Sequence, residues 1–273
     1  STPAHAMDTV LSGALAARNF KQIALTGAEG VVTPCPSCLA NLKLARHRMQ
    51  DAAFKARVDA LLDSPTVENA EALPETYSVL QIILEQIGPE AIRARVTRPL
   101  EGVKIATYYG CLMSRPADVM QFDDPENPTA MDKIMEALGA EVVDFPLKTE
   151  CCGVARQDET GSLSGRILAT ARSFGADAVV TACPLCHMNL DLRQGQAERQ
   201  MRLKFRLPVF YYTQLMGLAF GLPDETLKLD KLAVDPAPFL QLVARRRKAR
   251  IDAAAEAARA AMEKAESEEG AAS

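Results

Sequence analysis

Residues 175–190 read GADAVVTACPLCHMNL, and residues 27–42 read GAEGVVTPCPSCLANL. Ten of the sixteen positions are identical at a constant offset of 148 residues, and the identities include both cysteines and the proline between them. In each copy we expect a helix to end at the first glycine, a Val-Val strand to follow, and Cys-Pro to open the next helix, because proline suits the first helical position. The chain therefore contains an internal repeat of a strand–cysteine–helix unit.

The paired cysteines of this unit are Cys35 and Cys38 in the first copy and Cys183 and Cys186 in the second. We expect the first cysteine of each pair at the end of a strand and the second in the first turn of the following helix. Backbone N–H groups and the helix dipole favour a thiolate at that position. Both pairs are therefore candidate metal ligands.

Strands and helices are predicted to alternate around the second copy. The predicted strands cover residues 104–109, 141–145, 179–180 and 208–212, and the predicted helices follow Asn127-Pro128, include Leu163 to Ala171 and cover Leu215 to Phe220. A largely helical connector that includes residues 76–87 is expected between the copies. This alternation favours an α/β fold with parallel sheet, in which ligands bind at the carboxyl ends of the strands. The cysteines of the second copy fall at that edge.

Composition narrows the class of protein. The 273 residues are 48% hydrophobic, which is enough for substantial cores, and the net charge of -4 without a basic stripe argues against a nucleic-acid partner. Because no run of eighteen apolar residues and no signal peptide is found, we expect a cytoplasmic chain without direct membrane insertion. Seven cysteines would remain thiols in that compartment, so their grouping indicates ligands or redox groups.

The second copy belongs to a larger set of cysteines. Cys111 is separated from the pair Cys151-Cys152 by 39 residues, and Cys183 follows after a further 30. With Cys186 these are five thiols, one more than a tetrahedral zinc site or an ordinary four-iron cube requires. The diverging side chains of a vicinal pair would more easily reach two irons of an extended cluster than one ion. We therefore expect an iron-sulfur cluster, with structural zinc and unrelated buried cysteines as the alternatives.

The order Cys, Cys-Cys-Gly, Cys-x-x-Cys resembles the cysteine-rich CCG domain. The surroundings resemble the B subunit of heterodisulfide reductase over about residues 5–220, through Tyr109-Gly110-Cys111, Arg115-Pro116, Phe122 to Pro128 and Cys183 to His187. This resemblance implies two similar Rossmann-like CCG domains, each holding a noncubane [4Fe-4S] cluster, and cleavage of a disulfide between the clusters. It also implies a ferredoxin-like C subunit and a flavin-containing A subunit as partners.

The resemblance implies one complete ligand set for the second cluster, namely Cys111, Cys151, Cys152, Cys183 and Cys186. Cys35 and Cys38 match only the closing pair of the first cluster. Subtracting 148 places the missing Cys-Cys at Pro3-Ala4 and the counterpart of Cys111 before Ser1. We therefore expect the chain to be a piece of a longer one, with loss of the first site as the alternative.

A second departure from the family pattern lies between Cys152 and Cys183. This spacing is a few residues shorter than in the methanogen pattern, and Val154-Ala155-Arg156 stands where a glycine-rich stretch would be expected.

We divide the chain into a partial first CCG domain with its connector (residues 1–98), a complete second CCG domain (99–235) and an alanine-rich helical tail (236–273). The tail is expected to be solvated, or to dock on a partner subunit.

Other polar residues near the cysteines have two interpretations each. His187 is a candidate donor in the second shell of the cluster or a packing residue, and Arg115 would bind an anionic substrate or solvate a loop. Asp123, Asp124 and Glu126 are interleaved with prolines and asparagine, which predicts a turn and a helix cap and assigns them no chemistry.

These observations predict an oxidoreductase that acts on sulfur groups within a multisubunit complex. Because no Gly-x-Gly-x-x-Gly fingerprint follows a strand, any flavin should belong to another subunit. The substrate would be a small disulfide or a related sulfur compound. The alternatives are an electron-transfer subunit of a succinate, glycolate, lactate or glycerol-3-phosphate dehydrogenase, and a structural zinc protein.

Overall fold

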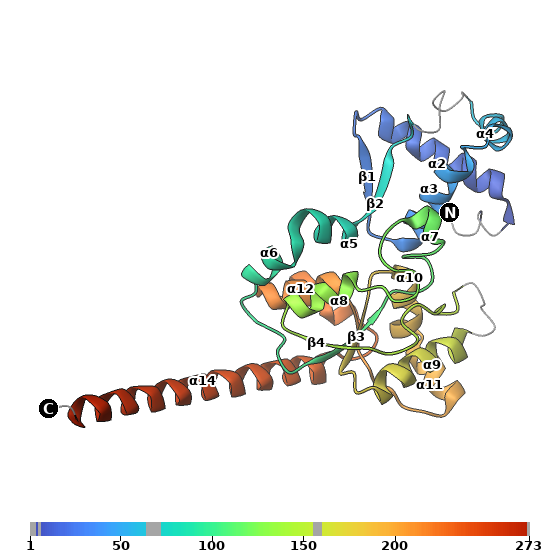
Figure 1. Ribbon diagram of the computed structural model, residues 1–273. Helices are drawn as coiled ribbons and strands as arrows, with labels where there is room; N and C mark the ends of the chain where they lie inside the picture. Colours follow the sequence, from blue (N-terminus) through green and yellow to red (C-terminus); the bar gives the residue numbers. More distant parts are fainter. Residues whose placement is uncertain (1–3, 5–6, 64–71, 155–159, 272–273) are drawn as a thin grey trace.

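The computed structural model describes the chain apart from residues 1–3, 5–6, 64–71, 155–159 and 272–273. Its described part contains two parallel sheets, one of two strands in the order β1-β2 and one of four strands in the order β4-β3-β5-β6. Helices connect the strands throughout (Figure 1). The predicted α/β architecture with parallel sheets is therefore confirmed.

The four-stranded sheet belongs to the second copy of the repeat. Its strands are β3 (Lys104–Tyr108), β4 (Glu141–Val143), β5 (Ala178–Thr181) and β6 (Val209–Tyr211). The helices around it are α7 (Ala117–Met120), α8 (Ala130–Ala137), α9 (Thr160–Ser173), α10 (Pro184–His187), α11 (Gln194–Met201), α12 (Tyr212–Phe220) and α13 (Asp224–Leu227), with a π-helical segment η4 (Met188–Leu192) and a 3-10 turn η5 (Leu229–Lys231). Each predicted strand and helix of this unit is present, and the strand ends differ from the prediction by at most two residues.

Alternate residues of these strands face two different helical layers. Ile105 and Val180 pack with α8 and α12 on one face of the sheet. Ala106, Tyr108 and Val179 pack with α9 and α11 on the other face. Because side chains alternate along a strand, both faces of a parallel sheet must be covered by helices. The three layers leave the carboxyl ends of β3 and β5 pointing toward the first unit of the chain (Figure 1).

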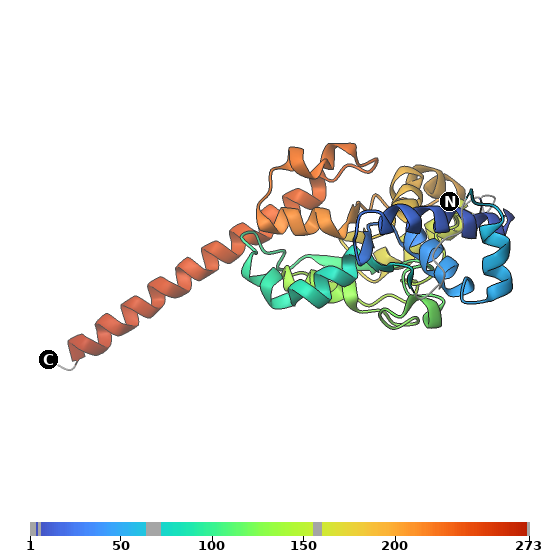
Figure 2. The ribbon, with the colours of Figure 1, turned by 90° about the horizontal axis from the view of Figure 1, so that it is seen from above.

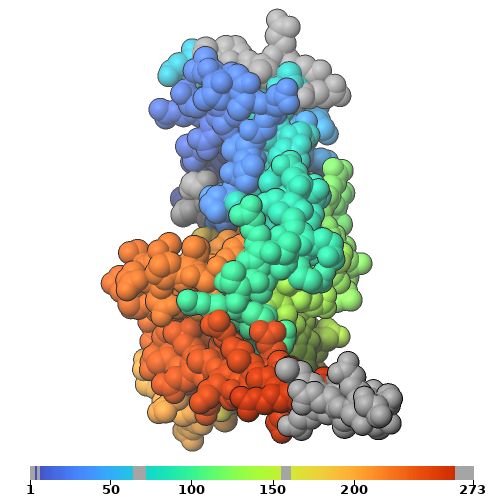
Figure 3. All heavy atoms as spheres, turned by 90° about the vertical axis from the view of Figure 1, so that its left-hand side faces the viewer, coloured from blue at the N-terminus to red at the C-terminus, as the bar shows by residue number. Residues whose placement is uncertain are grey.

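The first unit is smaller. It consists of α2 (Thr9–Ala24), β1 (Gly30–Thr33), α3 (Pro36–Arg48), α4 (Ala52–Asp59) and β2 (Glu75–Ser78), followed by the connector α5 (Val79–Ile82), the π-helical η2 (Ile83–Ile87) and α6 (Gly88–Ala94). A separate hydrophobic core joins α2, α3 and α4. In Figure 3 the teal connector runs from this unit down to the orange and red surface of the second unit.

One prediction in the connector is wrong at its start. Residues 76–78 are not helical and belong instead to β2, which pairs in parallel with β1 through Val31 and Thr76. Thr76 and Tyr77 are residue types that favour strands. Ser78 then caps α5 by accepting a hydrogen bond from Gln81 N at 2.9 Å, so the helix begins after it.

The start of α8 also differs from prediction. Its N-cap position is Thr129 rather than Asn127-Pro128. The carboxylate of Asp123 caps the helix from a distance in sequence, because it accepts hydrogen bonds from Thr129 N at 2.9 Å and Ala130 N at 2.6 Å. Asp124 accepts hydrogen bonds from the N–H groups of the next turn. The predicted turn and cap are thus present, with Asp123 as the capping side chain.

The last helix, α14 (Ala237–Ala271), has a buried start and an exposed continuation. Phe239 is 3% exposed and packs on Phe210 with a ring-centroid distance of 5.0 Å, and Val243 is also buried. From Arg245 to Ala261 every side chain is exposed. Figure 2 shows the helix projecting away from the rest of the molecule. The core of the second unit therefore includes the first turns of α14.

None of the helices in the described residues is long and apolar enough to cross a membrane.

Candidate metal centre

The cysteines lie at the carboxyl ends of the parallel strands. Cys111 follows β3 after Gly110, the pair Cys151-Cys152 lies in the segment after β4, and Cys183 follows β5 as the N-cap residue of α10. In the first unit, Cys35 is likewise the N-cap residue of α3. Proline occupies the first helical turn in both copies, as predicted.

The side chains of these cysteines form a continuous row of contacts. Cys111 lies within hydrogen-bonding reach of Cys151, and Cys152 lies within reach of both Cys151 and Cys186. Cys183 reaches Cys186 on one side and Cys35 on the other. The row therefore joins the five thiols predicted for the second cluster and adds Cys35 from the first unit. No three His, Cys, Asp or Glu side chains in the part of the chain that is described are grouped as a site for a single ion.

Cys35 reaches the second unit because α3 packs against α7. Leu39 and Ala40 of α3 form a small apolar core with Met120, and Lys43 donates a hydrogen bond to the carbonyl oxygen of Met120 at 2.8 Å. This contact lies only nine residues beyond Cys111 in sequence. The other thiol of the first unit, Cys38, is exposed.

Hydrogen bonding between the thiols shifts their pKa values. A hydrogen bond with Cys151, together with burial, raises the pKa of Cys111 above its usual range. Hydrogen bonding with Cys151 also raises the pKa of Cys152, to about 11. Hydrogen bonds from Cys186 and Cys35 lower the pKa of Cys183 to about 3. Among these three thiols, Cys183 therefore ionises most readily.

Gly110 allows β3 to approach this row closely. Its φ of +71° lies in the left-handed region that favours glycine, and a Cβ atom there would lie 3.0 Å from Cys186 Sγ. The neighbouring Tyr108 is fully buried and donates a hydrogen bond from its hydroxyl to Glu150 O at 2.6 Å. The hydrogen bond joins the end of β3 to the segment that carries Cys151, and the absence of a side chain at Gly110 leaves room for Cys186 Sγ beside it.

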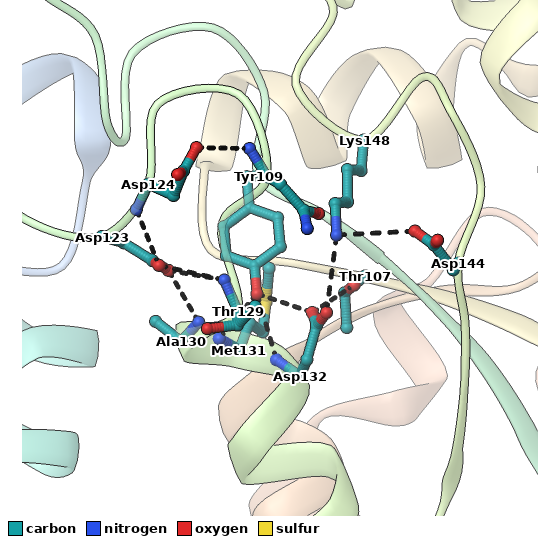
Figure 4. Close-up of polar contacts among 11 residues, drawn as sticks. Thr107, Tyr109, Asp123, Asp124, Thr129, Ala130, Met131, Asp132, Asp144 and Lys148 are labelled. Carbon is teal, nitrogen blue, oxygen red and sulfur yellow. Dashed lines mark hydrogen bonds and ion pairs between the residues drawn. The ribbon is translucent and has the colours of Figure 1, made fainter. Parts of the chain in front are cut away.

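A polar network on the other face of β3 joins the end of this strand to the segment that leads to Cys151 (Figure 4). The hydroxyl of Tyr109 donates to Asp132 Oδ1 at 2.6 Å and accepts from Met131 N at 2.8 Å. Lys148 Nζ lies 3.6 Å from Asp132 Oδ2, and its side chain is only 8% exposed. The carbonyl oxygen of Lys148 accepts hydrogen bonds from Tyr109 N and Gly110 N at 2.8 and 3.1 Å. Cys111 and Cys151 are therefore held by a common support.

The two other predicted site residues are engaged in local contacts. His187 stacks on Tyr211 with a centroid distance of 4.4 Å, and its Nε2 lies 3.0 Å from Val209 O. Burial lowers the pKa of His187. The guanidinium of Arg115 donates to Pro125 O, Glu126 and Thr149, which connects two loops. His187 is thus packed against β6 and Arg115 bridges two loops, while their roles toward a cluster and an anionic substrate stay predictions.

Two polar residues near the row are missed by the sequence analysis. The amide of Asn189 donates to Cys152 O at 3.1 Å and lies 3.5 Å from Cys152 Sγ. Ser164 donates to the same carbonyl oxygen at 2.9 Å. The repeat contains a signal for Asn189, because Asn41 occupies the equivalent position. No comparable sequence signal marks Ser164.

The donor set fits a cluster of several irons. Thiolates are soft ligands that select iron-sulfur clusters, zinc or copper. The sulfur atoms extend as a row across the ends of β3 and β5, and Cys152, Cys183 and Cys186 are buried. This arrangement offers several sulfur ligands along one sheet edge.

Comparisons with known proteins agree with this geometry. The CCG cysteine-rich domain matches residues 3–43 and 105–191, which include all seven cysteines. The membrane anchor subunit of 8-methylmenaquinol:fumarate reductase from Wolinella succinogenes is 33% identical over 209 residues, or 75% of this chain and 72% of that protein. The B subunit of a ferredoxin/F420H2-dependent CoB-CoM heterodisulfide reductase from Methanosarcina acetivorans is 30% identical over 234 residues, or 83% of this chain and 77% of that protein.

A solved structure shares the fold. The crystal structure of a hypothetical protein from Helicobacter pylori superposes on this chain with a TM-score of 0.64 and 12% sequence identity. The match covers 83% of this chain and 42% of the other. At this identity the likeness concerns the fold alone.

Proposed function

The chain belongs to the CCG cysteine-rich domain family together with the B subunit of heterodisulfide reductase, and from this premise we propose that it is the sulfur-handling redox subunit of a heterodisulfide reductase-like complex. Cys111, Cys151, Cys152, Cys183 and Cys186 would bind one noncubane [4Fe-4S] cluster. The row of contacting thiols at the sheet edge is the observation that carries the proposal.

The arrangement of the thiols suits a substrate that contains sulfur. When bound, the cluster supplies single electrons and an iron site for a sulfur atom. Cys152, Cys183 and Cys186 are buried, whereas Cys111 and Cys151 are partly exposed. A substrate would therefore approach from the side of Cys111 and Cys151, while the buried thiols hold the protected side of the site.

The overall reaction requires partners. Reduction of a disulfide breaks one S–S bond, consumes two electrons and two protons, and releases two thiols. We propose that a ferredoxin-like C subunit and a flavin-containing A subunit deliver the electrons. The contact between Cys35 and Cys183 supports a role for both units, because it brings the closing pair of the first unit beside the complete set of the second.

A second candidate function is electron transfer within a dehydrogenase or reductase complex. It is favoured by the similarity to the membrane anchor subunit of a fumarate reductase, which is 33% identical to this chain. In that case the same cysteines would bind the cluster, but no substrate sulfur would bind to it.

Metal analysis after anaerobic purification tests the cluster. We expect iron and acid-labile sulfide in equal amounts, about four of each for one complete site. Zinc in place of iron and sulfide would contradict both candidate functions and favour the structural zinc protein.

Electron paramagnetic resonance separates the two redox functions. On addition of a thiol under oxidising conditions, a disulfide-handling subunit should give a new paramagnetic signal, because the substrate sulfur binds at the cluster. The protein should be in its complete form, with every cluster assembled. An unchanged spectrum would favour electron transfer.

A further inference from the structure

Asn189 is a buried side-chain amide in contact with the thiol row. Its Nδ2 lies 3.1 Å from Cys152 O and 3.5 Å from Cys152 Sγ, and the residue is completely buried. The orientation of the amide follows from this geometry. A carbonyl oxygen can only accept a hydrogen bond, so the NH2 group of Asn189 must face Cys152.

The same orientation leaves the other end of the amide unpartnered. Asn189 Oδ1 is buried and has no hydrogen-bond partner among the described residues. Nearly all buried polar atoms in proteins are paired, so an unpaired one requires a physical explanation. Here the Nδ2 group of the amide contacts Cys152 O and Sγ, and the Oδ1 atom is left without a hydrogen-bond donor in the described part of the chain.

The local backbone favours this placement. Asn189 lies in the π-helical segment η4, which directly follows α10. Such segments are rare and are often found at functional sites. In the first unit the equivalent Asn41 lies within the regular helix α3 and is only half-buried. The repeated asparagine therefore has different surroundings in the two units.

From this geometry we propose that Asn189 is a positioning residue that donates an N–H···S hydrogen bond to Cys152 and thereby sets the reduction potential of the bound cluster. The proposal rests on the function proposed above. Hydrogen bonds to ligand sulfur atoms stabilise the more negative, reduced state of an iron-sulfur cluster. Removal of this donor should therefore shift the midpoint potential to more negative values.

A purely structural role must be distinguished from this one. Asn189 could serve only to anchor the carbonyl oxygen of Cys152. Ser164 is a matched control, because it donates to the same carbonyl oxygen at 2.9 Å. It is also fully buried. A variant without the Ser164 hydroxyl loses an anchor of the segment and keeps the contact between Asn189 and the sulfur.

The experiment is a redox titration of the anaerobically loaded chain, followed by electron paramagnetic resonance. Iron and sulfide are measured first in the wild type, since a wild type that binds neither contradicts the proposed function itself. With the wild type loaded, we expect Asn189→Leu to shift the midpoint potential to more negative values. Ser164→Ala and Asn41→Leu should keep the wild-type midpoint.

Each other outcome is also decisive. An Asn189→Leu midpoint equal to that of the wild type, or an equal shift in Ser164→Ala, would overturn the inference and leave the proposed function intact. If Asn189→Leu does not load, Asn189→Ala replaces it, because it also lacks the amide and avoids a bulky apolar side chain. Loss of loading in both Asn189 variants would overturn the inference, because the amide would then be needed to assemble the site and not to set its potential.

Discussion

The two copies of the repeat share their cysteines and differ in what surrounds them. All four residues of β5 are buried, whereas Thr33 is the only fully buried residue of β1. Cys186 is buried, and its counterpart Cys38 is exposed. In the second unit β5 lies between β3 and β6, while in the described part of the first unit β1 pairs with β2 alone.

This difference separates the local role of the motif from the requirements of a site. Cys-Pro-x-Cys produces the same strand end and helix start in both units. The second unit adds β3 and β4, and the segments after them carry Cys111 and the pair Cys151-Cys152. The closing pair therefore supplies only one of the three segments that must converge at the sheet edge.

The largest expected difference between the two units is in iron content, when the equivalent cysteines Cys186 and Cys38 are replaced. Cys186→Ser should abolish most iron binding, because Cys186 contacts both Cys152 and Cys183 in the middle of the row. Cys38→Ser should leave the iron content of the second site unchanged. Iron and sulfide analysis of the two purified variants measures this. An equal loss in both variants would mean that the two units form one interdependent site.

Much of this comparison could be predicted from the sequence. The repeat, the strand ends and the helix starts depend on residues that are close in sequence, such as Cys183 and Pro184, so local rules were sufficient. The contact between Cys35 and Cys183 depends on how α3 packs against α7, and no local pattern encodes it.

Two other features, β2 and the role of Asn189, were not predicted from the sequence. β2 forms because Thr76 pairs with Val31, which is 45 residues away in sequence. The helical spacing of apolar residues begins only after β2, at Val79, but the predicted helix extends back to residue 76. Asn189 had a signal in the repeat, yet its role depends on the π-helical segment that buries it. Pairing across the sheet and irregular helix geometry are both set by tertiary packing.

The second comparison is between Gly110 and Gly27, and it tests how closely the backbone after β3 approaches Cys186. Gly110 and Gly27 both have a φ of +71°, but a Cβ atom at Gly27 would meet nothing within 4 Å. Gly27→Ala should therefore cost about 1 kcal/mol from backbone strain alone. Gly110→Ala should cost about 3 kcal/mol, since contact with Cys186 Sγ is added to the strain, and it should reduce iron loading. Urea denaturation of the metal-free variants measures both costs, and equal values would contradict the close approach.

The equivalent valines Val180 and Val32 test the burial of the equivalent strands β5 and β1. Val180 is completely buried between the helical layers, whereas Val32 is 48% exposed. Val180→Ala should reduce the free energy of unfolding by about 2.5 kcal/mol through lost burial and a cavity. Val32→Ala should change it by less than about 0.5 kcal/mol. A large effect at Val32 would show that this surface is covered in the folded protein.

The smallest expected difference compares two lysines that connect segments. Lys148 Nζ lies 3.6 Å from Asp132, which is itself only 14% exposed, so Lys148→Met leaves a mostly buried carboxylate without its cation. Thr107 and Tyr109 still donate to that carboxylate, which limits the expected loss to about 2 kcal/mol. Lys43→Met removes one hydrogen bond to a neutral carbonyl oxygen and should cost about 1 kcal/mol.

Urea denaturation measures these two costs. The control is Lys133→Met, because Lys133 is an exposed lysine of α8. If Lys43→Met proves the more damaging, the contact between α3 and α7 stabilises the molecule more than the network below β3. The two units would then depend on each other for folding, and the second unit could not be treated as the independent support of the thiol row.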